Sequence, residues 1–562
     1  MGSQVDYSLY LVTDSTEAIL GNRDLVDVVD QALLGGKDKT SDTGVLISTA
    51  KALHAKCRQH NIPLLINDRV DVALAVGCEG VHLGQDDMSI ETARQILGDD
   101  KIIGATVSSI EEAKVAVERG ADYLGIGTLY ATNTKKNTKD IIGINGIRKI
   151  LRYLHTSSDE KAKKVKTVCI GGINASNLQR VLYQLHASTP SSSPTTKPID
   201  GAAIVSAIIG SPDPLKATQT LKSLITTPPP FAPATLPAFQ LHSPDDELTA
   251  LKLSAPKYIS AVHTLSPLSH NMTNLVVQHI SASIALALGA SPIMSNNGAE
   301  AQDLAALNGA LVINMGTATP EALKNHALAL SAYNATGNPT VLDPVGAGAT
   351  SARRSALSFL LSSGYFTLIK GNEAEILALA HATGFTLSNT SSSQQRGVDS
   401  GTARFSTEQR ASIVREIAAR ERNIVLMTGK IDVISDGKRT YAIENGHEYL
   451  GLITGSGCTL GTTLSAYLAA AVQARKSDES GWEPDLLFAA LVAIVHFETA
   501  AERAAKREDV KGPGTFVPAF VDEVWKIGRE TVEKADLGWW DGVRVRVLGD
   551  QEVGEGLLSK QS

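Results

Sequence analysis

Two segments in the first half of the chain place carboxylates directly after short apolar runs. "LLIND" ends in Asn67 and Asp68, and "GVHLGQDD" ends in Asp86 and Asp87. If both runs are neighbouring strands of a parallel sheet, their carboxyl ends meet at one edge. Carboxylates there suit Mg²⁺, which takes oxygen ligands and binds substrate phosphates as well. The alternative is that each Asp caps the following helix, but the coincidence at two adjacent strand ends favours the metal.

A glycine-rich turn in the second half has the features of an anion site. "TGSGC" (454–458) precedes a long helical pattern, and Gly455 and Gly457 allow close approach to the backbone. Successive N–H groups at a helix start suit a transferring phosphoryl group. A helix N-terminus also lowers a thiol pKa, which would make Cys458 a base or a polar neighbour of a substrate hydroxyl. The alternative is an ordinary helix start with a buried cysteine.

Other strand ends of the second half carry polar side chains. "LDPVGAGATSARR" places Asp343 after a strand and Arg353 beyond a turn, and "NIVLMTG" ends a strand at Thr428. "IKGNEAEIL" places Asn372 and Glu375 at a helix start, where they could act on Mg²⁺ indirectly. Asn372 is also a good helix cap by residue type, so capping remains the alternative there.

Three loops of the first half could bind phosphate. "GTLYATNTKKNTK" offers hydroxyls and a cation after a strand, although a solvated polar loop is the alternative for this segment. "CIGGIN" and "AAIVSA" end the last two predicted strands, where backbone amides commonly form a barrel phosphate site. The candidate residues are Thr132, Thr134, Lys135, Gly172, Val205 and Ser206.

Alternating strands and helices must position these residues in the first half. The predicted strands are mostly apolar throughout, as expected for a parallel sheet buried on both faces: "YSLYLVTD", "IPLLIND", "GVHLGQ", "KIIGATV", "ADYLGIGTL", "VKTVCIGG" and "GAAIVSA". A (β/α)₈ barrel needs eight strands, and these are seven. The alternation fails at "QALLGGKDKTSDTG" (31–44), where turn formers and charges separate two helical patterns. We therefore predict a barrel whose second strand is missing, with an open doubly wound sheet as the alternative.

A second α/β unit follows a proline-rich tract. Its predicted strands are "GALVINMG", "PTVLDPVG", "YFTLIKGN" and "NIVLMTG", with a hairpin in "DVISDGKRTYAIENG" and a helix buried on all sides in "NLVVQHISASIALALGA". We predict one domain over residues 1–225, a linker over 226–257 and a second domain over 258–550. The Ser/Thr/Pro-rich tracts 186–198 and 388–406 are predicted loops.

Composition excludes several classes of protein. The net charge of −7 and the pI near 6.0 argue against a nucleic-acid-binding footprint. The four cysteines form no CxxC pair, zinc spacing or disulfide framework. The N-terminus resembles no signal peptide, and no apolar run approaches the ~20 residues of a membrane span. We expect a cytoplasmic enzyme that acts on small-molecule substrates and binds neither nucleic acid nor a membrane.

The first half resembles the thiamine phosphate synthase family over most of residues 5–225. The similarity rests on "LINDRVDVALAVGCEGVHLGQDDM", "YLGIGTLYATNTKK" and "IGGI". It implies a TIM barrel that joins hydroxymethylpyrimidine diphosphate to hydroxyethylthiazole phosphate by displacing pyrophosphate, without a protein nucleophile. It also implies that Asp68 and Asp87 hold Mg²⁺ and that Thr106 contacts the pyrimidine. It implies that Asn67 and Lys135 bind the diphosphate. The residues that would bind the thiazole phosphate are Thr132, Thr134, Gly172, Val205 and Ser206.

The resemblance also bears on the irregular stretch at 31–44. After its first helix the synthase family has a strand with a Gln-x-Arg-x-Lys motif that grips the diphosphate. Lys39 aligns with the lysine of that motif and Lys37 with its arginine, while the preceding strand residues and the Gln have no counterpart. The resemblance therefore implies a weakened diphosphate grip.

The second half resembles the hydroxyethylthiazole kinase family, of ribokinase-like α/β fold, over about residues 258–550. The similarity rests on "ALGASPIMS", "LDPVGAGAT", "KGNEAEI" and "TGSGC". It implies ATP- and Mg²⁺-dependent phosphorylation of the thiazole hydroxyethyl group. Two family asparagines are replaced by His279 and Ser283. The implied roles are catalysis for Cys458, thiazole contacts for Met294 and Gly455, ATP contacts for Arg353 and Thr428, and action through Mg²⁺ for Asp343 and Glu375.

The two halves together resemble the bifunctional thiamine biosynthesis proteins of fungi. The kinase would make the thiazole phosphate that the synthase consumes, so the expected product is thiamine phosphate. The alternative is an active kinase fused to an impaired barrel that serves as an assembly or ligand-binding module, because a strand is missing. A third hypothesis, another phosphate-binding barrel fused to a sugar-type kinase, is disfavoured by the cysteine of "TGSGC". By resemblance we expect a homo-oligomer, a trimer or hexamer.

Overall fold

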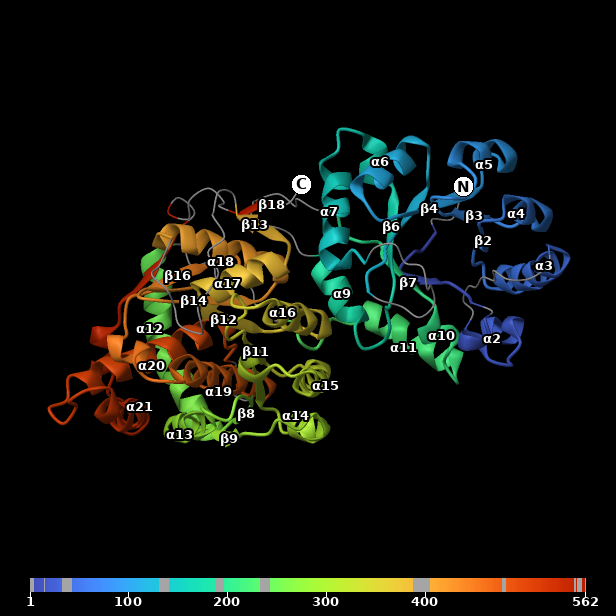
Figure 1. Ribbon diagram of the computed structural model, residues 1–562. Coiled ribbons are helices and arrows are strands. Elements are labelled where there is room, and N and C mark those ends of the chain that lie inside the picture. The colour runs from blue at the N-terminus through green and yellow to red at the C-terminus, as the bar shows by residue number, and fades with distance from the viewer. Residues whose placement is uncertain are drawn as a thin grey trace. The chain divides into compact units, whose positions relative to one another are not determined.

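The computed structural model divides the 562-residue chain into two compact units, Met1–Pro229 and Pro230–Ser562 (Figure 1). It describes residues 5–14, 16–32, 43–130, 141–186, 197–232, 243–387, 405–477, 482–549, 552 and 558–560. Within these ranges both units are mixed α/β, as predicted. Each unit is described separately below.

The first unit is built on one parallel sheet. All seven predicted strands are present, and the sheet order is β1-β7-β6-β5-β4-β3-β2. In this order β1 and β2 are the two edges, and no pairing joins them among the described residues. The strands are β1 (Leu9–Leu11), β2 (Leu65–Asn67), β3 (Gly80–Leu83), β4 (Ile102–Val107), β5 (Tyr123–Ile126), β6 (Lys166–Ile170) and β7 (Gly201–Ile204).

The sheet curls so strongly that side chains from distant strands meet inside it. The hydroxyls of Tyr10 on β1 and Tyr123 on β5 lie 3.1 Å apart, although β7 and β6 separate these strands. The Tyr123 ring occupies the space beside Gly104 of β4, where a Cβ atom would lie 2.1 Å from the ring. A glycine is therefore required at 104, since only the missing side chain lets the tyrosine fill the interior.

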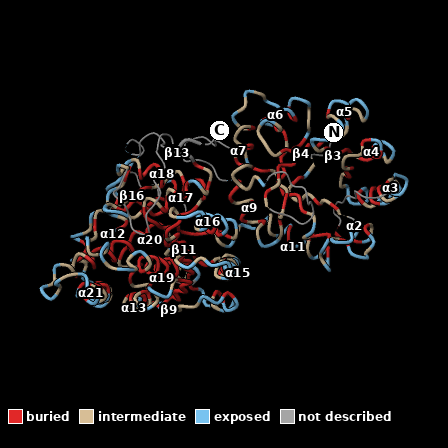
Figure 2. Tube along the Cα trace, viewed as in Figure 1, coloured by how far each residue is buried: buried red, intermediate tan, exposed pale blue. Residues whose placement is uncertain are grey.

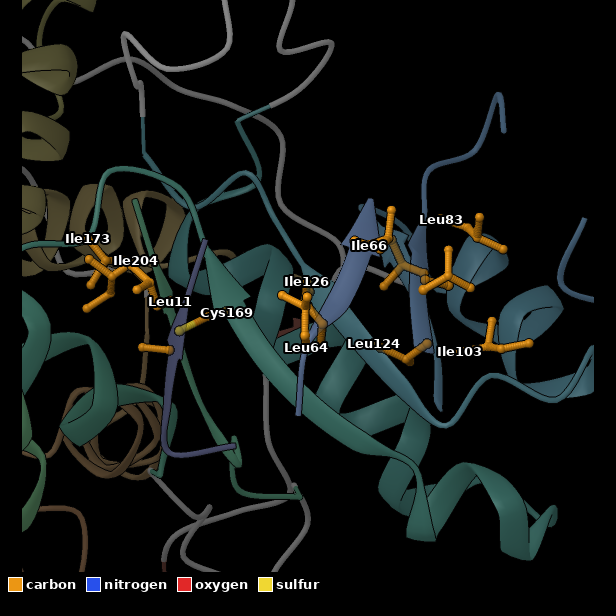
Figure 3. Close-up of a cluster of buried hydrophobic side chains, with 14 of the residues drawn as sticks. Leu11, Leu64, Ile66, Leu83, Ile103, Leu124, Ile126, Cys169, Ile173 and Ile204 are labelled. Carbon is orange, nitrogen blue, oxygen red and sulfur yellow. The ribbon is translucent and has the colours of Figure 1, made fainter. Parts of the chain in front are cut away.

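Helices cover the convex side of this sheet. Their apolar faces pack on the outward residues of the strands, including Leu11, Ile103 and Ile204 (Figure 3). The helices are α1 (Glu17–Leu20), α2 (Leu25–Ala32), α3 (Thr43–Gln59), α4 (Val70–Val76), α5 (Ile90–Leu97), α6 (Ile110–Glu118), α7 (Gly143–Thr156), α8 (Glu160–Lys164), α9 (Leu178–Leu185), α10 (Ser206–Ile209) and α11 (Pro214–Thr226).

The predicted missing strand falls between the two edge strands of the described sheet. In an eight-stranded barrel the second strand would stand between β1 and β2, which are the two edges of the sheet formed by the described residues. Along the chain, that position falls between α2 and α3, at residues 33–42. This segment, which includes Lys37 and Lys39, lies outside the described residues. The described part of the first unit is thus a curled, partial barrel.

The second unit contains a nine-stranded mixed sheet. Its order is β17-β16-β15-β14-β12-β11-β10-β8-β9, and the four predicted strands and the predicted hairpin β15–β16 are all confirmed. The strands are β8 (Leu268–Met272), β9 (Ser291–Ile293), β10 (Ala310–Asn314), β11 (Thr340–Asp343), β12 (Leu368–Asn372), β14 (Ile424–Thr428), β15 (Asp432–Ser435), β16 (Thr440–Ile443) and β17 (Val545–Val547). A separate pair joins β13 (Phe385–Leu387) to β18 (Leu558–Lys560).

Two hydrophobic cores flank this sheet. One core contains residues of α12 (Pro244–Leu265), α13 (Gln278–Leu288), α19 (Ser456–Ser477), α20 (Leu486–Ala505) and α21 (Pro513–Lys534), and α20 is buried along most of its length (Figure 2). The other contains residues of α14 (Ala301–Ala306), α15 (Pro320–Thr336), α16 (Ser351–Ser363), α17 (Glu373–Ala382) and α18 (Thr407–Glu421). Short 3₁₀ turns are η1 (Gly298–Glu300), η2 (Met315–Thr317), η3 (Glu448–Gly451) and η4 (Gly538–Gly542).

Two details differ from the sequence prediction. The predicted linker 226–257 ends earlier, because α12 begins at Pro244; Ser243 caps the Asp246 N–H, and acidic residues fill the first turn. The helix predicted to be buried on all sides, α13, buries one side, whereas Leu286 is 64% exposed. None of the helices in the described part of the chain has the length and apolar character that a membrane crossing demands.

Candidate active sites

The predicted carboxylates of the first unit stand at the ends of paired strands. Asn67 of β2 is in register with His82 of β3, and the next residue, Asp68, adopts a left-handed backbone with φ 63°. The Asp68 N–H donates to the His82 carbonyl at 2.9 Å, and the Asn67 amide donates to the Asp68 carboxylate. This geometry holds the Asp68 side chain at the carboxyl edge of the sheet.

The second carboxylate is held by the turn after β3. The Gly84 N–H donates to the Asp87 carboxylate at 2.6 Å. Asp68 and Asp87 supply the hard oxygen donors that Mg²⁺ prefers, so the donor chemistry fits this ion. No group of three or more His, Cys, Asp or Glu side chains arranged around a metal position occurs in the described ranges. A Mg²⁺ ion held by these two carboxylates would take further oxygen ligands from water or from substrate phosphates.

A histidine inside the curled sheet orients Thr106. His82 contacts the Thr106 hydroxyl at 2.8 Å through Nε2 and the Tyr123 hydroxyl at 2.7 Å through Nδ1. The Gln85 side-chain amide donates to the Thr106 carbonyl at 2.5 Å. Burial raises the pKa of Tyr123 well above its usual value, so the phenol keeps its proton. The predicted pyrimidine contact thus belongs to a polar network whose central member, His82, was not among the predicted site residues.

The ends of β6 and β7 form adjacent backbone turns. Gly171 and Gly172 have φ of 114° and 65°, and the Asn177 amide donates to the Gly172 carbonyl at 2.9 Å. Val205 precedes Ser206, the first residue of the one-turn helix α10. Since β6 and β7 are paired neighbours, these turns lie side by side at the carboxyl edge. The remaining predicted residues of this site, Thr132, Thr134, Lys135 and Lys39, lie outside the described residues.

The second unit brings four side chains together at the start of α19. Lys370 of β12 pairs with Asp343 at the end of β11, with 3.0 Å between Nζ and Oδ2. The same Nζ donates to the Gly457 carbonyl in the first turn of α19 at 2.8 Å. Asn314 of β10 donates to the Asp343 carboxylate at 3.0 Å and to the Cys458 sulfur at 3.1 Å. Three neighbouring strands and one helix start therefore converge on one polar cluster, in which Asn314, Asp343 and Lys370 are buried.

The expected low thiol pKa of Cys458 is wrong. Burial and the nearby Asp343 carboxylate raise its pKa to about 12, and the Lys370 ammonium and the Asn314 donor only partly oppose them. Removing a thiol from water disfavours the thiolate more than the helix start stabilises it. The thiol is therefore protonated at neutral pH, which fits a polar neighbour of substrate rather than a base.

Glu375 and Asn372 form a helix cap, which was the alternative to a role at the metal. Asn372 caps α17 by accepting the Glu375 N–H, and the Glu375 carboxylate accepts the Asn372 N–H, forming a capping box. Its other oxygen accepts the Gly346 N–H at 2.8 Å. Burial and Asp343 raise the Glu375 pKa to about 7. Because backbone N–H groups engage both oxygens, this carboxylate fits an indirect role near a metal better than direct ligation.

The other predicted kinase residues, Arg353 of α16, Thr428 of β14 and Met294 after β9, lie at or just beyond the ends of strands of the same sheet. Arg353 donates to the carbonyls of Met315, Gly316 and Val345 at 3.1, 3.1 and 2.7 Å, which ties the turns after β10 and β11 together. Thr428 ends β14, and Met294 follows β9.

Gly455 has a backbone conformation that favours glycine, as its residue type suggested. Its φ is 84°, and a Cβ there would lie 2.8 Å from Val277. The turn that precedes α19 therefore needs a glycine at this position.

A cavity of about 180 Å³ adjoins the cluster. Its walls are neutral polar side chains in the main, and two buried atoms, Thr273 Oγ1 and His326 Nδ1, lack a hydrogen-bond partner within the described structure. Burial lowers the His326 pKa to about 4, so this imidazole is neutral. Asn314 forms one wall and also contacts Cys458, so the cavity lies directly beside the polar cluster.

Comparison with known proteins matches each half separately. A model described as "Thiamine monophosphate synthase" matches residues 9–208, and one described as "Hydroxyethylthiazole kinase family" matches residues 259–530. The "Thiamine-phosphate synthase" of Clostridium novyi is 37% identical over 226 residues, covering 39% of this chain and 99% of that protein.

Two relatives match almost the entire chain. The "Probable thiamine biosynthetic bifunctional enzyme" of Schizosaccharomyces pombe is 40% identical over 551 residues, 96% of this chain and 98% of that protein. The "Thiamine biosynthetic bifunctional enzyme" of Saccharomyces cerevisiae is 34% identical over 563 residues, 94% of this chain and 96% of that protein. Both halves are therefore joined in the same order as in these proteins.

Proposed function

The chain belongs to the family of thiamine biosynthetic bifunctional enzymes, with thiamine-phosphate synthase and hydroxyethylthiazole kinase activities, and we propose that the two sites described above carry these activities. The kinase half phosphorylates the thiazole alcohol with ATP. The synthase half joins the thiazole phosphate to hydroxymethylpyrimidine diphosphate. The observation that carries the residue assignment is the convergence of Asn314, Asp343, Lys370 and Cys458 at the start of α19.

In the kinase half, positioning is the main task of the protein. Phosphoryl transfer passes through a loose transition state, so charge stabilisation and alignment matter more than proton removal. The N–H groups in the first turn of α19 would face the transferring phosphoryl group, and Lys370 fixes that turn against Asp343. The neutral Cys458 thiol would contact the substrate hydroxyl. Met294 and Gly455 would contact the thiazole, and Arg353 and Thr428 the nucleotide side.

In the synthase half, positioning and charge stabilisation would likewise be the main task, here for a leaving pyrophosphate. Asn67 and Lys135 would hold the diphosphate, and Thr106, oriented by His82, would contact the pyrimidine. The backbone turns at Gly172 and Val205–Ser206, with Thr132 and Thr134, would hold the thiazole phosphate. Lys39 would contribute charge from the segment after α2. We propose a TIM barrel for this half and a ribokinase-like fold for the other.

Mg²⁺ is the metal that we propose for both sites. When bound, it would neutralise phosphate charge during each reaction. Asp68 and Asp87 would hold it in the synthase. Asp343 would hold it in the kinase, and Glu375 would act indirectly because its oxygens accept backbone N–H groups.

A coupled assay tests the function. The full chain, given ATP, Mg²⁺, the thiazole alcohol and the pyrimidine diphosphate, should form thiamine phosphate, and omission of ATP should stop it. Preformed thiazole phosphate should restore product without ATP, because it bypasses the kinase. Absence of product from preformed thiazole phosphate, with an active kinase, would refute synthase activity for this chain.

A second candidate for that half is favoured because no pairing joins β1 to β2 within the part of the chain that the structure describes. An unpaired strand edge buried inside a barrel is costly, and part of the family's diphosphate grip has no counterpart in the sequence. We propose that the synthase is weakened and at the extreme serves as an assembly or ligand-binding module. Inserting the family's strand before Lys37 should raise the synthase rate and leave the kinase rate unchanged; no gain would count against this candidate.

An oligomer is also proposed, on the exposed apolar residues near the start of α13. Leu275 and Val276 are 81% and 73% exposed in the single chain, next to Asn274, whose side-chain amide donates to the Asn314 side-chain carbonyl oxygen at 3.3 Å. Adjacent exposed apolar side chains are typical of association surfaces. Light scattering after size-exclusion chromatography should give a mass of three or six times 59.3 kDa, and the mass of a single chain would refute the oligomer.

A further inference from the structure

A tight turn follows β14 and carries the proposed ATP contact. β14 ends at Thr428, β15 begins at Asp432, and residues 429–431 connect them. Gly429 and Lys430 are exposed, whereas both ends of the turn enter the sheet. The direction of Thr428 therefore depends on whatever holds this short connection.

Arg410 of α18 holds the turn from its buried side. Its guanidinium donates to the carbonyl of Ile431 at 2.6 Å and to those of Met427 and Thr428 at 3.2 Å each. The residue is 4% exposed. Three carbonyls on both sides of the turn thus share one rigid planar donor, a geometry that lysine cannot reproduce.

Two further contacts tie this arrangement to neighbouring elements. Asp432 accepts the Gly429 N–H at 2.8 Å, which closes the turn. Arg410 also lies 4.0 Å from the carboxylate of Glu373, the first residue of α17. Since α17 carries Glu375, one arginine links the turn at Thr428 to the helix start beside the polar cluster.

We propose that Arg410 is a positioning residue of the kinase nucleotide site, acting by holding the turn at Thr428 in its binding geometry. The inference rests on the proposed function, because it takes Thr428 as a nucleotide contact. Arg410 itself is buried beneath the turn and acts through the carbonyls it binds. Its loss should therefore affect ATP binding more than the chemical step or thiazole binding.

The test measures kinase kinetics of the full chain with the R410K variant. R410K keeps the charge but cannot span three carbonyls. We expect the KM for ATP to rise about tenfold, the equivalent of one or two lost hydrogen bonds, with kcat and the thiazole KM within about twofold of the parent. A second variant, G429A, disturbs the contact between Arg410 and the turn from the turn side, since its Cβ would lie 2.8 Å from Arg410 Nη2. It should raise the ATP KM in the same direction and is available if R410K does not fold.

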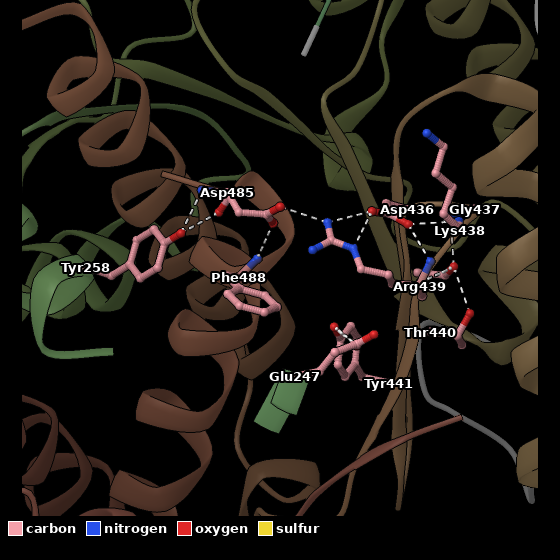
Figure 4. A network of polar contacts seen from close by, with 11 residues as sticks. Glu247, Tyr258, Asp436, Gly437, Lys438, Arg439, Thr440, Tyr441, Asp485 and Phe488 are labelled. Atoms are coloured by element: carbon pink, nitrogen blue, oxygen red, sulfur yellow. Dashed lines mark hydrogen bonds and ion pairs between the residues drawn. The ribbon is translucent and has the colours of Figure 1, made fainter. Parts of the chain in front are cut away.

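Arg439 offers a matched control. It is an arginine of the adjacent hairpin with charged partners, binding Asp436 at 2.7 Å and Asp485 at 2.9 Å away from Thr428 (Figure 4). R439K should lower the melting temperature and leave the ATP KM unchanged. If R410K also lowers only the melting temperature, Arg410 is structural and the inference is overturned.

A double variant separates this inference from the proposed function. T428V alone should raise the ATP KM, and it should add little in the R410K background, because both changes disable one contact. Fully additive effects would overturn the inference while leaving Thr428 as an ATP contact. If T428V alone has no effect, the Thr428 assignment fails, and a raised ATP KM in R410K would still support a nucleotide role for the turn.

Discussion

Replacing Lys370 by methionine should strongly destabilise the kinase half. The Lys370 and Asp343 side chains are only 3% and 2% exposed, and their charged atoms lie 3.0 Å apart. Although burial alone would lower the Lys370 pKa, Asp343 and its other acidic neighbours raise it, so the ammonium is charged. The K370M variant would leave Asp343 buried with the Asn314 donor as its remaining described partner. Removing one member of a buried pair typically costs about 3–5 kcal/mol.

The chain carries its own reporter for this measurement. All four tryptophans, Trp482, Trp525, Trp539 and Trp540, lie in the second half of the sequence. Tryptophan fluorescence during urea unfolding therefore follows the kinase unit, and the synthase unit contributes nothing to it. With a urea dependence of about 2–3 kcal/mol per M, the midpoint should fall by roughly 1–2.5 M.

The double variant K370M/D343N provides the decisive comparison. It removes both charges, so no unpaired charge is buried, and it should recover a large part of the lost stability. A loss below about 1 kcal/mol for K370M, or a double variant no more stable than K370M, would refute a compensated buried ion pair. Both variants should lack kinase activity, so activity alone does not distinguish the outcomes.

Three other predictions follow from the same structure. Because the Cys458 pKa is about 12, iodoacetamide at pH 8 should alkylate this thiol at least about a hundredfold more slowly than free glutathione, measured by peptide mass mapping; a comparable rate would disprove the raised pKa. Because Glu375 has a pKa of about 7 in the folded state and 4.5 as its ordinary value, the folded chain binds the extra proton, and kinase-half stability should fall as pH rises from about 4.5 to 7, by up to about 3 kcal/mol. E375Q should flatten this part of the stability profile, and an unchanged slope would exclude Glu375 as its source. G104A should cost about 1–3 kcal/mol in the first unit and reduce thiamine phosphate formation from preformed thiazole phosphate, with an unchanged kinase rate; a fully active synthase would mean that the Tyr123 ring can yield.

The strands of both sheets were predictable because they are continuous apolar runs. Parallel strands buried on both faces need such runs, and turn formers bound each one. The residues of the buried cluster were harder to predict. Lys370 lies inside the run "TLIKGN" and Asn314 inside "LVINMG", so each reads as a strand residue, and the partners that make them functional come from distant segments.

The sequence prediction also failed at places where two local features indicated opposite outcomes. "HSPDDE" contains a cap, a proline at the first turn and three acids, which together start α12, but the preceding prolines suggested a longer linker. At Cys458 the helix start suggested a low pKa, and burial beside Asp343 had the larger effect. His82 was identifiable only as an inward position of β3, since its role depends on Tyr123 and Thr106 across the curl.

The contact between Gly104 and Tyr123 sets a rule for how this sheet can diverge. The Tyr123 ring occupies the volume that any side chain at 104 would need, so the two positions share one space. A descendant could exchange the tyrosine for a small residue and the glycine for a large one, but either change alone meets a clash or leaves a void. The pair should therefore covary among relatives, with a small residue at one position wherever the other is large.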